Sequence, residues 1–129
     1  MKILAIDDER DTRQLMKDLL SHAGHQVTTA SDAVEALAHL QMARYELVLL
    51  DMMMPGIDGA QLAQYLSTHW NTFDIPVLVV SCRKDAECKS WAQLNGCVGY
   101  IEKPFSPSEL LDAVARVEKQ GGTNKALPA

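Results

Sequence analysis

Four short apolar runs of strand length each end at, or just before, a side chain that carries a charge or a hydroxyl group. Strands buried on both faces of a parallel sheet are almost continuous in apolar residues, so these runs indicate such strands. The runs and the polar residues that follow them are 2–6 with Asp7 and Asp8, 45–50 with Asp51, 76–80 with Ser81, and 98–101 with Lys103 two residues later. If the strands are parallel neighbours, three acids, a hydroxyl and an amine converge on one small site.

Strand-like and helix-like segments alternate five times, which is the pattern of βαβ units on a parallel sheet. The second strand is expected near 25–29, after a helix that Gly24 ends. We therefore predict an α/β fold, a doubly wound five-stranded parallel sheet of order 2-1-3-4-5 with right-handed crossovers. In such a sheet the ligand crevice lies at the carboxyl ends of the strands, beside the switch between the first and third strands. Asp7, Asp8 and Asp51 are expected at that crevice.

Local signals mark where the helices begin and which side chains they bury. Asp32, with Glu35 three residues later, has the spacing of a capping box, which predicts a helix start. Apolar residues then recur at helical spacing, whereas a helix at about 84–94 has a weaker pattern. The residues expected to face the sheet include Val34, Leu37 and Leu40 in the earlier helix and Ala92 and Leu94 in the later one.

The last helix has the clearest start in the chain, with Ser106 as cap, Pro107 at the first helical position and Glu109 at the third. After this helix the sequence contains two adjacent glycines and a proline, which is typical of a flexible segment. We therefore expect one domain over 1–119, followed by a flexible tail or the stub of a linker over 120–129.

Composition limits the classes of function. With 129 residues, of which 47% are hydrophobic, the chain is long enough for one domain with a core. Its net charge of −5 disfavours direct binding to nucleic-acid backbones. No apolar run approaches the roughly 20 residues that span a bilayer, and no secretory leader pattern precedes the first strand. Together with three cysteines that form no paired motif, these features favour a cytoplasmic protein with no membrane partner.

The predicted cluster of acids sets a chemical requirement. Two like charges about 4 Å apart repel by roughly 4 kcal/mol at an effective dielectric of about 20, so the cluster needs a neutralising cation or a protonated acid. Oxygen ligands without Cys or His suit Mg²⁺, which leaves a coordination position for a phosphoryl oxygen. Lys103 would neutralise phosphoryl charge, and Ser81 would donate a hydrogen bond. Asp51 is the candidate nucleophile that would form an aspartyl phosphate.

At these residues the sequence resembles a known family. The residues that carry the resemblance are Asp7-Asp8, Asp51, the run Met-Pro-Gly-Ile-Asp-Gly at 54–59, Ser81, and Tyr100 with Lys103-Pro104-Phe105. In this order, and at strand ends, they are similar to the receiver domain of two-component response regulators over roughly residues 1–119. The resemblance implies a flavodoxin-like (βα)5 fold that acts as a phosphorylation-switched signalling domain in a phosphorelay.

The resemblance also implies roles for individual residues. Asp51 would accept a phosphoryl group from the phosphohistidine of a histidine kinase or a histidine phosphotransfer protein, with Lys103 binding the phosphate. Mg²⁺ would be the cofactor. Its implied ligands are Asp8, Asp51 and the backbone carbonyl of Met53, with Asp7 assisting through a water molecule. The Lys103–Pro104 peptide bond is usually cis in such domains, and we expect it to be cis here.

Ser81 and Tyr100 are implied to form a switch pair. On phosphorylation, Ser81 would move toward the phosphoryl group and Tyr100 would turn inward. This movement would change the face formed by the helix at about 84–94, the strand at 98–101 and the last helix. That face would bind a downstream protein or an attached output domain, and a homodimer through the same face stays open.

Two other classes of function share parts of this pattern. A phosphorylation-independent interaction module of the same fold is the main alternative, although an unused cluster of carboxylates would be costly. Hydrolases that use an aspartyl phosphate typically carry a second acid two residues after the nucleophile, where this chain has the apolar Met53. We therefore expect no enzyme acting on external substrates. The chain would be a phosphoacceptor with autocatalytic phosphotransfer and slow self-dephosphorylation, because Met53 cannot orient an attacking water.

Overall fold

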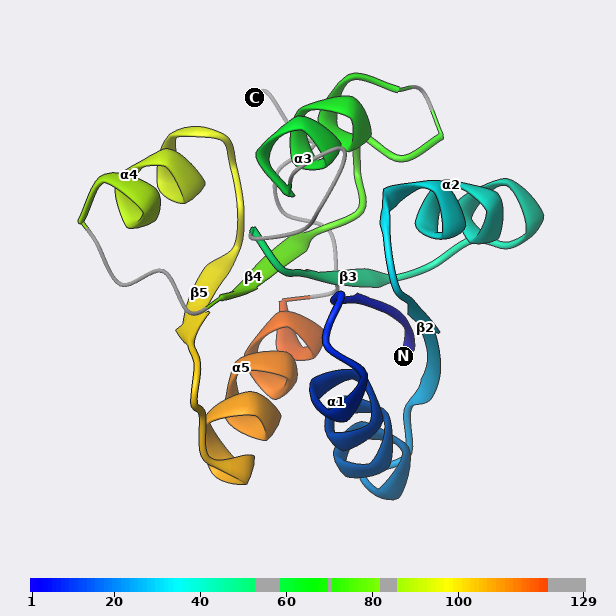
Figure 1. Cartoon of the computed structure of the whole chain (residues 1–129), viewed down its shortest axis with the longest axis vertical. Coiled ribbons are helices and arrows are strands. Elements are labelled where there is room, and N and C mark those ends of the chain that lie inside the picture. Colours follow the sequence, from blue (N-terminus) through cyan, green and yellow to red (C-terminus); the bar gives the residue numbers. More distant parts are fainter. Residues whose placement is uncertain (53–58, 70, 82–85, 121–129) are drawn as a thin grey trace.

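The chain folds as one five-stranded parallel sheet with helices on both faces (Figure 1). The computed structural model describes residues 1–52, 59–69, 71–81 and 86–120. The strands are β1 (Lys2–Ile6), β2 (Gln26–Ala30), β3 (Leu47–Leu50), β4 (Val77–Ser81) and β5 (Gly99–Glu102). The helices are α1 (Arg10–His22), α2 (Ala33–Met42), α3 (Gly59–Thr68), α4 (Ala86–Leu94) and α5 (Pro107–Lys119). The sheet order is β2-β1-β3-β4-β5, which confirms the predicted fold class and strand order.

Two layers of helices enclose the sheet. In Figure 1, α1 and α5 cover one face, and α2, α3 and α4 cover the other. Because successive side chains of a strand point to opposite faces, each strand contributes to both cores. In β1, for example, Ile3 and Ala5 pack with α1 and α5, whereas Leu4 and Ile6 pack with α2 and α3. This double burial explains the continuous apolar runs in the sequence.

Helix ends follow the predicted capping signals, with one difference. In α5 the Ser106 hydroxyl accepts from Glu109 N at 3.2 Å, and Glu109 Oε1 accepts from Ser106 N at 3.0 Å, which completes a capping box. At the start of α2, Asp32 accepts from Glu35 N at 2.8 Å, but the Glu35 carboxylate accepts from the Ser31 hydroxyl at 3.3 Å. Among the described helices, none combines the length and apolar character that a bilayer-spanning segment needs.

Two apolar side chains predicted to face the sheet are exposed instead. Val34 is 72% exposed and Leu94 is 86% exposed, so both predictions were wrong. The buried stripe of α2 consists of Ala33, Ala36 and Leu40, which have the spacing of one helix face. Small alanines let the helix lie close to the sheet, and Val34 is turned about 100° from Ala33 around the helix axis. The second strand also begins one residue later than predicted.

Candidate functional site

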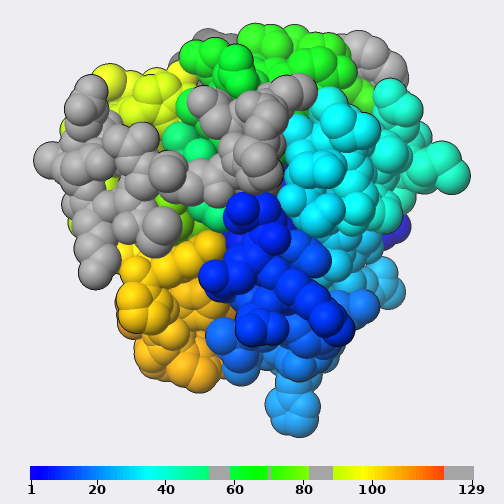
Figure 2. Space-filling model, in the orientation of Figure 1, coloured from blue at the N-terminus to red at the C-terminus, as the bar shows by residue number. Residues whose placement is uncertain are grey.

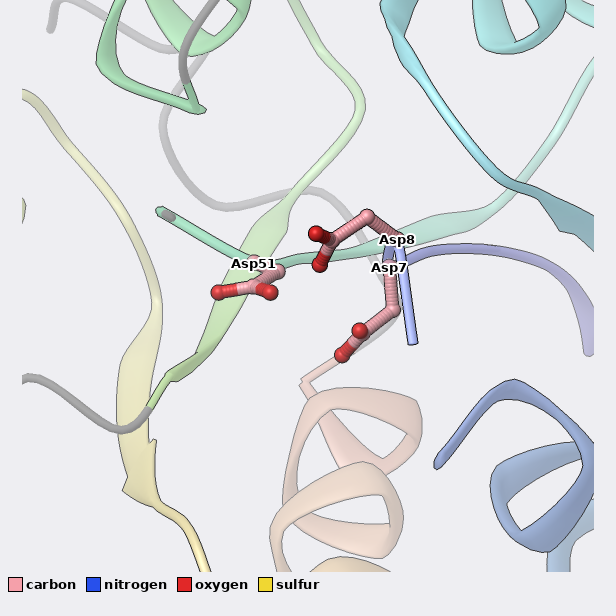
Figure 3. Close-up of side chains that lie close together, drawn as sticks. All are labelled: Asp7, Asp8 and Asp51. Carbon is pink, nitrogen blue, oxygen red and sulfur yellow. The ribbon is translucent and has the colours of Figure 1, made fainter. Parts of the chain in front are cut away.

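Three carboxylates gather at the carboxyl end of the sheet, just past β1 and β3. The strand ladder continues one residue beyond each strand: Asp7 N donates to Ala30 O at 3.1 Å, and Asp51 N donates to Ile6 O at 3.0 Å. Asp8 follows directly, so two neighbouring strand ends carry all three acids (Figure 3). One oxygen of each acid lies within 4.8 Å of the other two. The predicted convergence of the acids is therefore confirmed.

The three acids differ in how much of each is exposed to solvent. Asp7 is fully buried and Asp51 is 3% exposed, whereas Asp8 is exposed to solvent. Asp7 Oδ1 accepts from Glu9 N at 2.9 Å, which ties its side chain to the turn before α1. A carboxylate without solvent is costly unless a positive charge or a hydrogen bond compensates it. The site therefore needs a cation close to Asp7 and Asp51.

Lys103 supplies that charge. Its ammonium lies 2.6 Å from Asp7 Oδ2 and 3.3 Å from Asp51 Oδ2. Burial by itself would lower the pKa of Lys103, but its contact with Asp7 and its attraction to Asp7 and Asp51 raise the pKa above its usual value. Lys103 is therefore an ammonium throughout the physiological pH range. The Lys103–Pro104 peptide bond is cis, as predicted.

The donor set fits a hard divalent cation. Three carboxylates offer oxygen ligands, and no described histidine or cysteine joins the cluster. Asp7 Oδ2 is buried and accepts no hydrogen bond of regular geometry from the described residues, so its compensation is ionic. The sequence prediction gave Asp7 only a contact to Mg²⁺ through a water molecule. The structure shows that Asp7 also forms a direct ion pair with Lys103. The fourth predicted metal ligand, Met53, lies outside the described residues.

Ser81 and Tyr100 lie on the two strands beyond β3. Ser81 ends β4 and is fully buried, and its carbonyl accepts from Lys103 N at 2.9 Å. Tyr100 is half-buried in β5, where it packs against a small core of Met52, Val79 and Ala92. The sheet thus places the predicted hydroxyl at the same end as the acids, next to the segment that carries Lys103.

Tyr100 also contacts the helix that precedes β5. The ammonium of Lys89 in α4 lies 5.9 Å from the centre of the Tyr100 ring, a distance at which cations and aromatic rings attract. The same ammonium pairs with the carboxylate of Glu102 in β5. The Tyr100 ring is therefore held between the small core and an α4 side chain.

A cavity of about 400 Å³ opens beside the acids. Its lining comes from the start of α1, the end of β3 and the segment between β5 and α5, and consists of Asp8, Glu9, Thr12, Leu15, Asp51, Lys103, Pro104 and Phe105. Figure 2 shows the start of α1 (blue) on the surface next to the chain that leads into α5 (yellow to orange). Asp51 is thus reached from solvent past a partly apolar rim.

Gly59 supports the structure of the site, and no role was assigned to it from the sequence. A Cβ on Gly59 would lie 2.4 Å from Asp51 O and 2.6 Å from Met52 Cα. Gly59 N also donates a hydrogen bond to Met52 O at 3.4 Å. Only a residue without a side chain allows the start of α3 to approach the Asp51 backbone this closely. In the sequence, Gly59 appeared only as the last residue of the run at 54–59, without a structural role.

Comparison with known proteins agrees with the fold and with the group of acids and lysine at the end of the sheet. The sequence model described as "Response regulator receiver domain" matches residues 3–115. The solved structure of the Vibrio cholerae chemotaxis protein CheY4 is 34% identical with a TM-score of 0.85, covering 90% of this chain and 97% of that one. The receiver domain of NtrX from Brucella abortus is 34% identical with a TM-score of 0.84, covering 91% and 98%.

Curated relatives are longer than this chain. The phosphate regulon transcriptional regulatory protein PhoB of Pseudomonas aeruginosa is 33% identical over 120 residues, covering 93% of this chain and 52% of PhoB. A probable transcriptional regulator, ycf27 of Cyanophora paradoxa, is 38% identical over 109 residues, covering 84% of this chain and 44% of ycf27. This chain thus spans about half the length of these relatives. The chain belongs to the response regulator receiver domain family of two-component systems.

Proposed function

We propose that this receiver domain is a phosphorylation switch in which Asp51 accepts the phosphoryl group. The observation that carries the proposal is the position of the Asp51 carboxylate, 3.3 Å from the Lys103 ammonium and within 4.8 Å of two further acids. Asp51 also lines the cavity, whereas Asp7 is fully buried and does not. Of the three acids, Asp51 is the one that combines burial, a positive partner and access for a phosphodonor.

The donor would be the phosphohistidine of a histidine kinase or a histidine phosphotransfer protein. An Asp51 carboxylate oxygen forms a bond to phosphorus while the bond from phosphorus to the imidazole nitrogen breaks, and the electron pair of that bond stays on the imidazole. Lys103 balances charge that develops on the phosphoryl oxygens, and the Ser81 hydroxyl donates a hydrogen bond to one of them. This is transfer to the protein itself, so the domain consumes no external substrate.

Asp8 and Asp51 would hold Mg²⁺, together with the carbonyl of Met53, and Asp7 would assist through a water molecule. When bound, the ion neutralises the acids and polarises the phosphoryl group. Asp8 suits a ligand role because it is exposed and lies within 4.8 Å of its two neighbours. Slow self-dephosphorylation stays a prediction from the apolar Met53.

A direct experiment tests the acceptor. The full chain is mixed with Mg²⁺ and acetyl phosphate, and its intact mass is followed; beryllofluoride serves as a non-covalent phosphoryl mimic. We expect a gain of one phosphoryl group that requires Mg²⁺ and is absent in Asp51→Asn. If the wild type gains no phosphoryl group, or Asp51→Asn gains it equally, the proposal fails. The first result would favour an interaction module of this fold that works without phosphorylation.

We infer that the output surface is the face formed by α4, β5 and α5. Movement of Ser81 toward a phosphoryl group would free space for Tyr100, which is packed against a small core and an α4 side chain. The added charge of about −1.5 to −2 would drive that movement. The surface would then bind a downstream protein, an attached output domain or a second copy of the chain.

The domain boundary is also proposed. Residues 1–119 would form the receiver domain, and 120–129 would be a tail or linker. The relatives named as transcriptional regulators are about twice as long, which supports an output domain or partner protein as the recipient of the signal. With a net charge of −5, this chain itself would not contact nucleic acid.

A further inference from the structure

Arg13 binds the backbone beside the acid cluster instead of one of its carboxylates. It lies in the first turn of α1, where its amide donates to Glu9 O at 3.1 Å. Its guanidinium reaches back past the start of the helix, and Nη1 donates to Asp7 O at 2.8 Å. Across the described parts of the chain, Arg13 forms no ion pair. The acid cluster therefore gains a nearby positive charge without losing a carboxylate oxygen.

The position of Arg13 near the N-terminus of α1 is electrostatically unfavourable for a cation. The first turn of a helix carries partial positive charge, so acids are favoured there and cations are disfavoured. Arg13 is nevertheless half-buried in the first turn of α1, with its guanidinium on a carbonyl. Arg10 lies in the same turn and is exposed, whereas Arg13 binds the carbonyl of Asp7, the residue that follows β1.

The Asp7 carbonyl lies just beyond the hydrogen-bonded ladder between β1 and β2. Asp7 N still pairs with Ala30 O at 3.1 Å, but the chain turns away from β2 directly afterwards. A buried carbonyl without a hydrogen-bond partner costs about 1 to 3 kcal/mol. Arg13 supplies that partner, and since a peptide unit is planar, it also fixes the plane that leads to the Cα of Asp8.

The direction of the Asp8 carboxylate depends on this peptide plane more than the directions of the Asp7 and Asp51 carboxylates do. Asp7 is held by Lys103 and by Glu9 N, and Asp51 is held by Lys103. The Asp8 carboxylate is exposed and makes no hydrogen bond or ion pair to another described residue. Among the described residues, no side-chain partner directs the Asp8 carboxylate toward the other acids, so its direction depends on its backbone and rotamer.

We propose that Arg13 is a positioning residue for the cation site: by holding the Asp7–Asp8 peptide unit, it directs the Asp8 carboxylate toward Asp51. The proposal rests on the proposed function, because it assumes that these acids bind Mg²⁺. An argument from charge alone predicts the opposite effect of removing Arg13 on Mg²⁺ affinity. Removing a positive charge near an anionic site would strengthen cation binding, whereas removing a positioning bond would weaken it.

The sign of the effect is measured by calorimetric titration of the full chain with Mg²⁺ alone. In Arg13→Gln we expect Mg²⁺ to bind about five- to tenfold more weakly than in the wild type, which is the loss of roughly one hydrogen bond. Arg10→Gln is the matched control, because Arg10 is an exposed arginine in the same turn and makes no contact with the acids. Arg10→Gln should bind Mg²⁺ as tightly as the wild type, or slightly more tightly.

Ionic strength separates the two effects further. Salt at about 0.5 M screens the influence of a distant charge, but not the loss of a short hydrogen bond, so the weakening in Arg13→Gln should persist. Equal or tighter binding by Arg13→Gln overturns the proposal. If that variant does not fold, Arg13→Met is used, which cannot donate a hydrogen bond to the Asp7 carbonyl, and wild-type affinity in it has the same meaning. A wild type that binds no Mg²⁺ would refute the proposed function instead.

Discussion

Lys103 lies closer to Asp7 than to Asp51. Its ammonium is 2.6 Å from the carboxylate of Asp7, the fully buried acid, and 3.3 Å from that of Asp51, the proposed acceptor. Breaking a buried ion pair on one side leaves the other charge uncompensated, which costs more than the pair gains. Lys103 therefore stabilises the fold as well as contributing to the proposed chemistry.

Replacing this lysine should destabilise the domain in a way that a divalent ion repairs. In Lys103→Met at pH 7 without divalent ions, we expect the free energy of unfolding in urea to fall by about 2 to 4 kcal/mol. Mg²⁺ should stabilise the variant more than the wild type, because it replaces the missing charge. Lys17→Met, at an exposed position of α1, is the control. An unchanged unfolding midpoint in Lys103→Met would contradict this role.

The contact between Gly59 and the Asp51 backbone predicts a second effect. In Gly59→Ala the new methyl group would meet Asp51 O at 2.4 Å, so the backbone that presents Asp51 has to shift. We expect a loss of about 1 to 3 kcal/mol in stability, with weaker Mg²⁺-dependent phosphorylation by acetyl phosphate. Gly99→Ala is the matched control, because its methyl group meets a movable side-chain end, Leu78 Cδ1, at 2.8 Å. Equal phosphorylation in the two variants would reject a role for Gly59 in presenting Asp51.

The proposed switch predicts that Tyr100 carries the signal away from Asp51 without taking part in phosphorylation. In Tyr100→Ala, beryllofluoride with Mg²⁺ should still bind, because Tyr100 does not line the cavity at Asp51. Amide hydrogen exchange over α4 and β5 should change on binding in the wild type and change much less in the variant. Tyr65→Ala, on the exposed side of α3, should respond as the wild type does. A wild-type exchange response in Tyr100→Ala would remove this residue from the switch.

His25 predicts a dependence of stability on pH that is separate from the site. Burial, followed by the positive amino group of Met1 at 2.9 Å from Nδ1, lowers the pKa of His25 below 6.5, against the opposing influence of Glu118 and Glu46. The unfolded chain therefore takes up the proton first, and stability is lost as the pH falls below about 6.5.

A single substitution isolates the histidine contribution to acid sensitivity. His25→Gln has no titrating ring, so its free energy of unfolding should decline less between pH 7 and about pH 5 than that of the wild type. His22→Gln, at an exposed position near the end of α1, should follow the wild-type curve. Parallel curves for His25→Gln and the wild type would show that His25 is not the sensitive group.

Much of the fold and site was predictable because it follows from short-range patterns. Buried parallel strands need uninterrupted apolar residues, and the residue after each strand lies at the sheet edge, so Asp7, Asp51 and Ser81 could be grouped before any coordinates. The cap of α5 was equally local, since Ser106 and Glu109 contact each other within one turn. Such features depend on spacing alone.

The remaining features depend on how elements approach each other. Val34 was expected to face the sheet because of its helical spacing with Leu37 and Leu40, yet the close approach of α2 to the sheet buries Ala33 instead. The Gly59 contact arises because the start of α3 lies against the backbone at the end of β3, and the Arg13 bond arises because a side chain folds back over a helix start. None of these distances is encoded by residue spacing.

The ion pair between Asp7 and Lys103 joins the first strand to the segment after the last one. In the sheet, β3 and β4 lie between β1 and β5, so this contact forms only when these strands have assembled. Occupation of the pocket by a cation or a phosphoryl group is therefore coupled to the cooperative unfolding of the whole domain. A mutation far from the pocket that destabilises the sheet should lower the apparent ligand affinity once an appreciable fraction of the chain is unfolded.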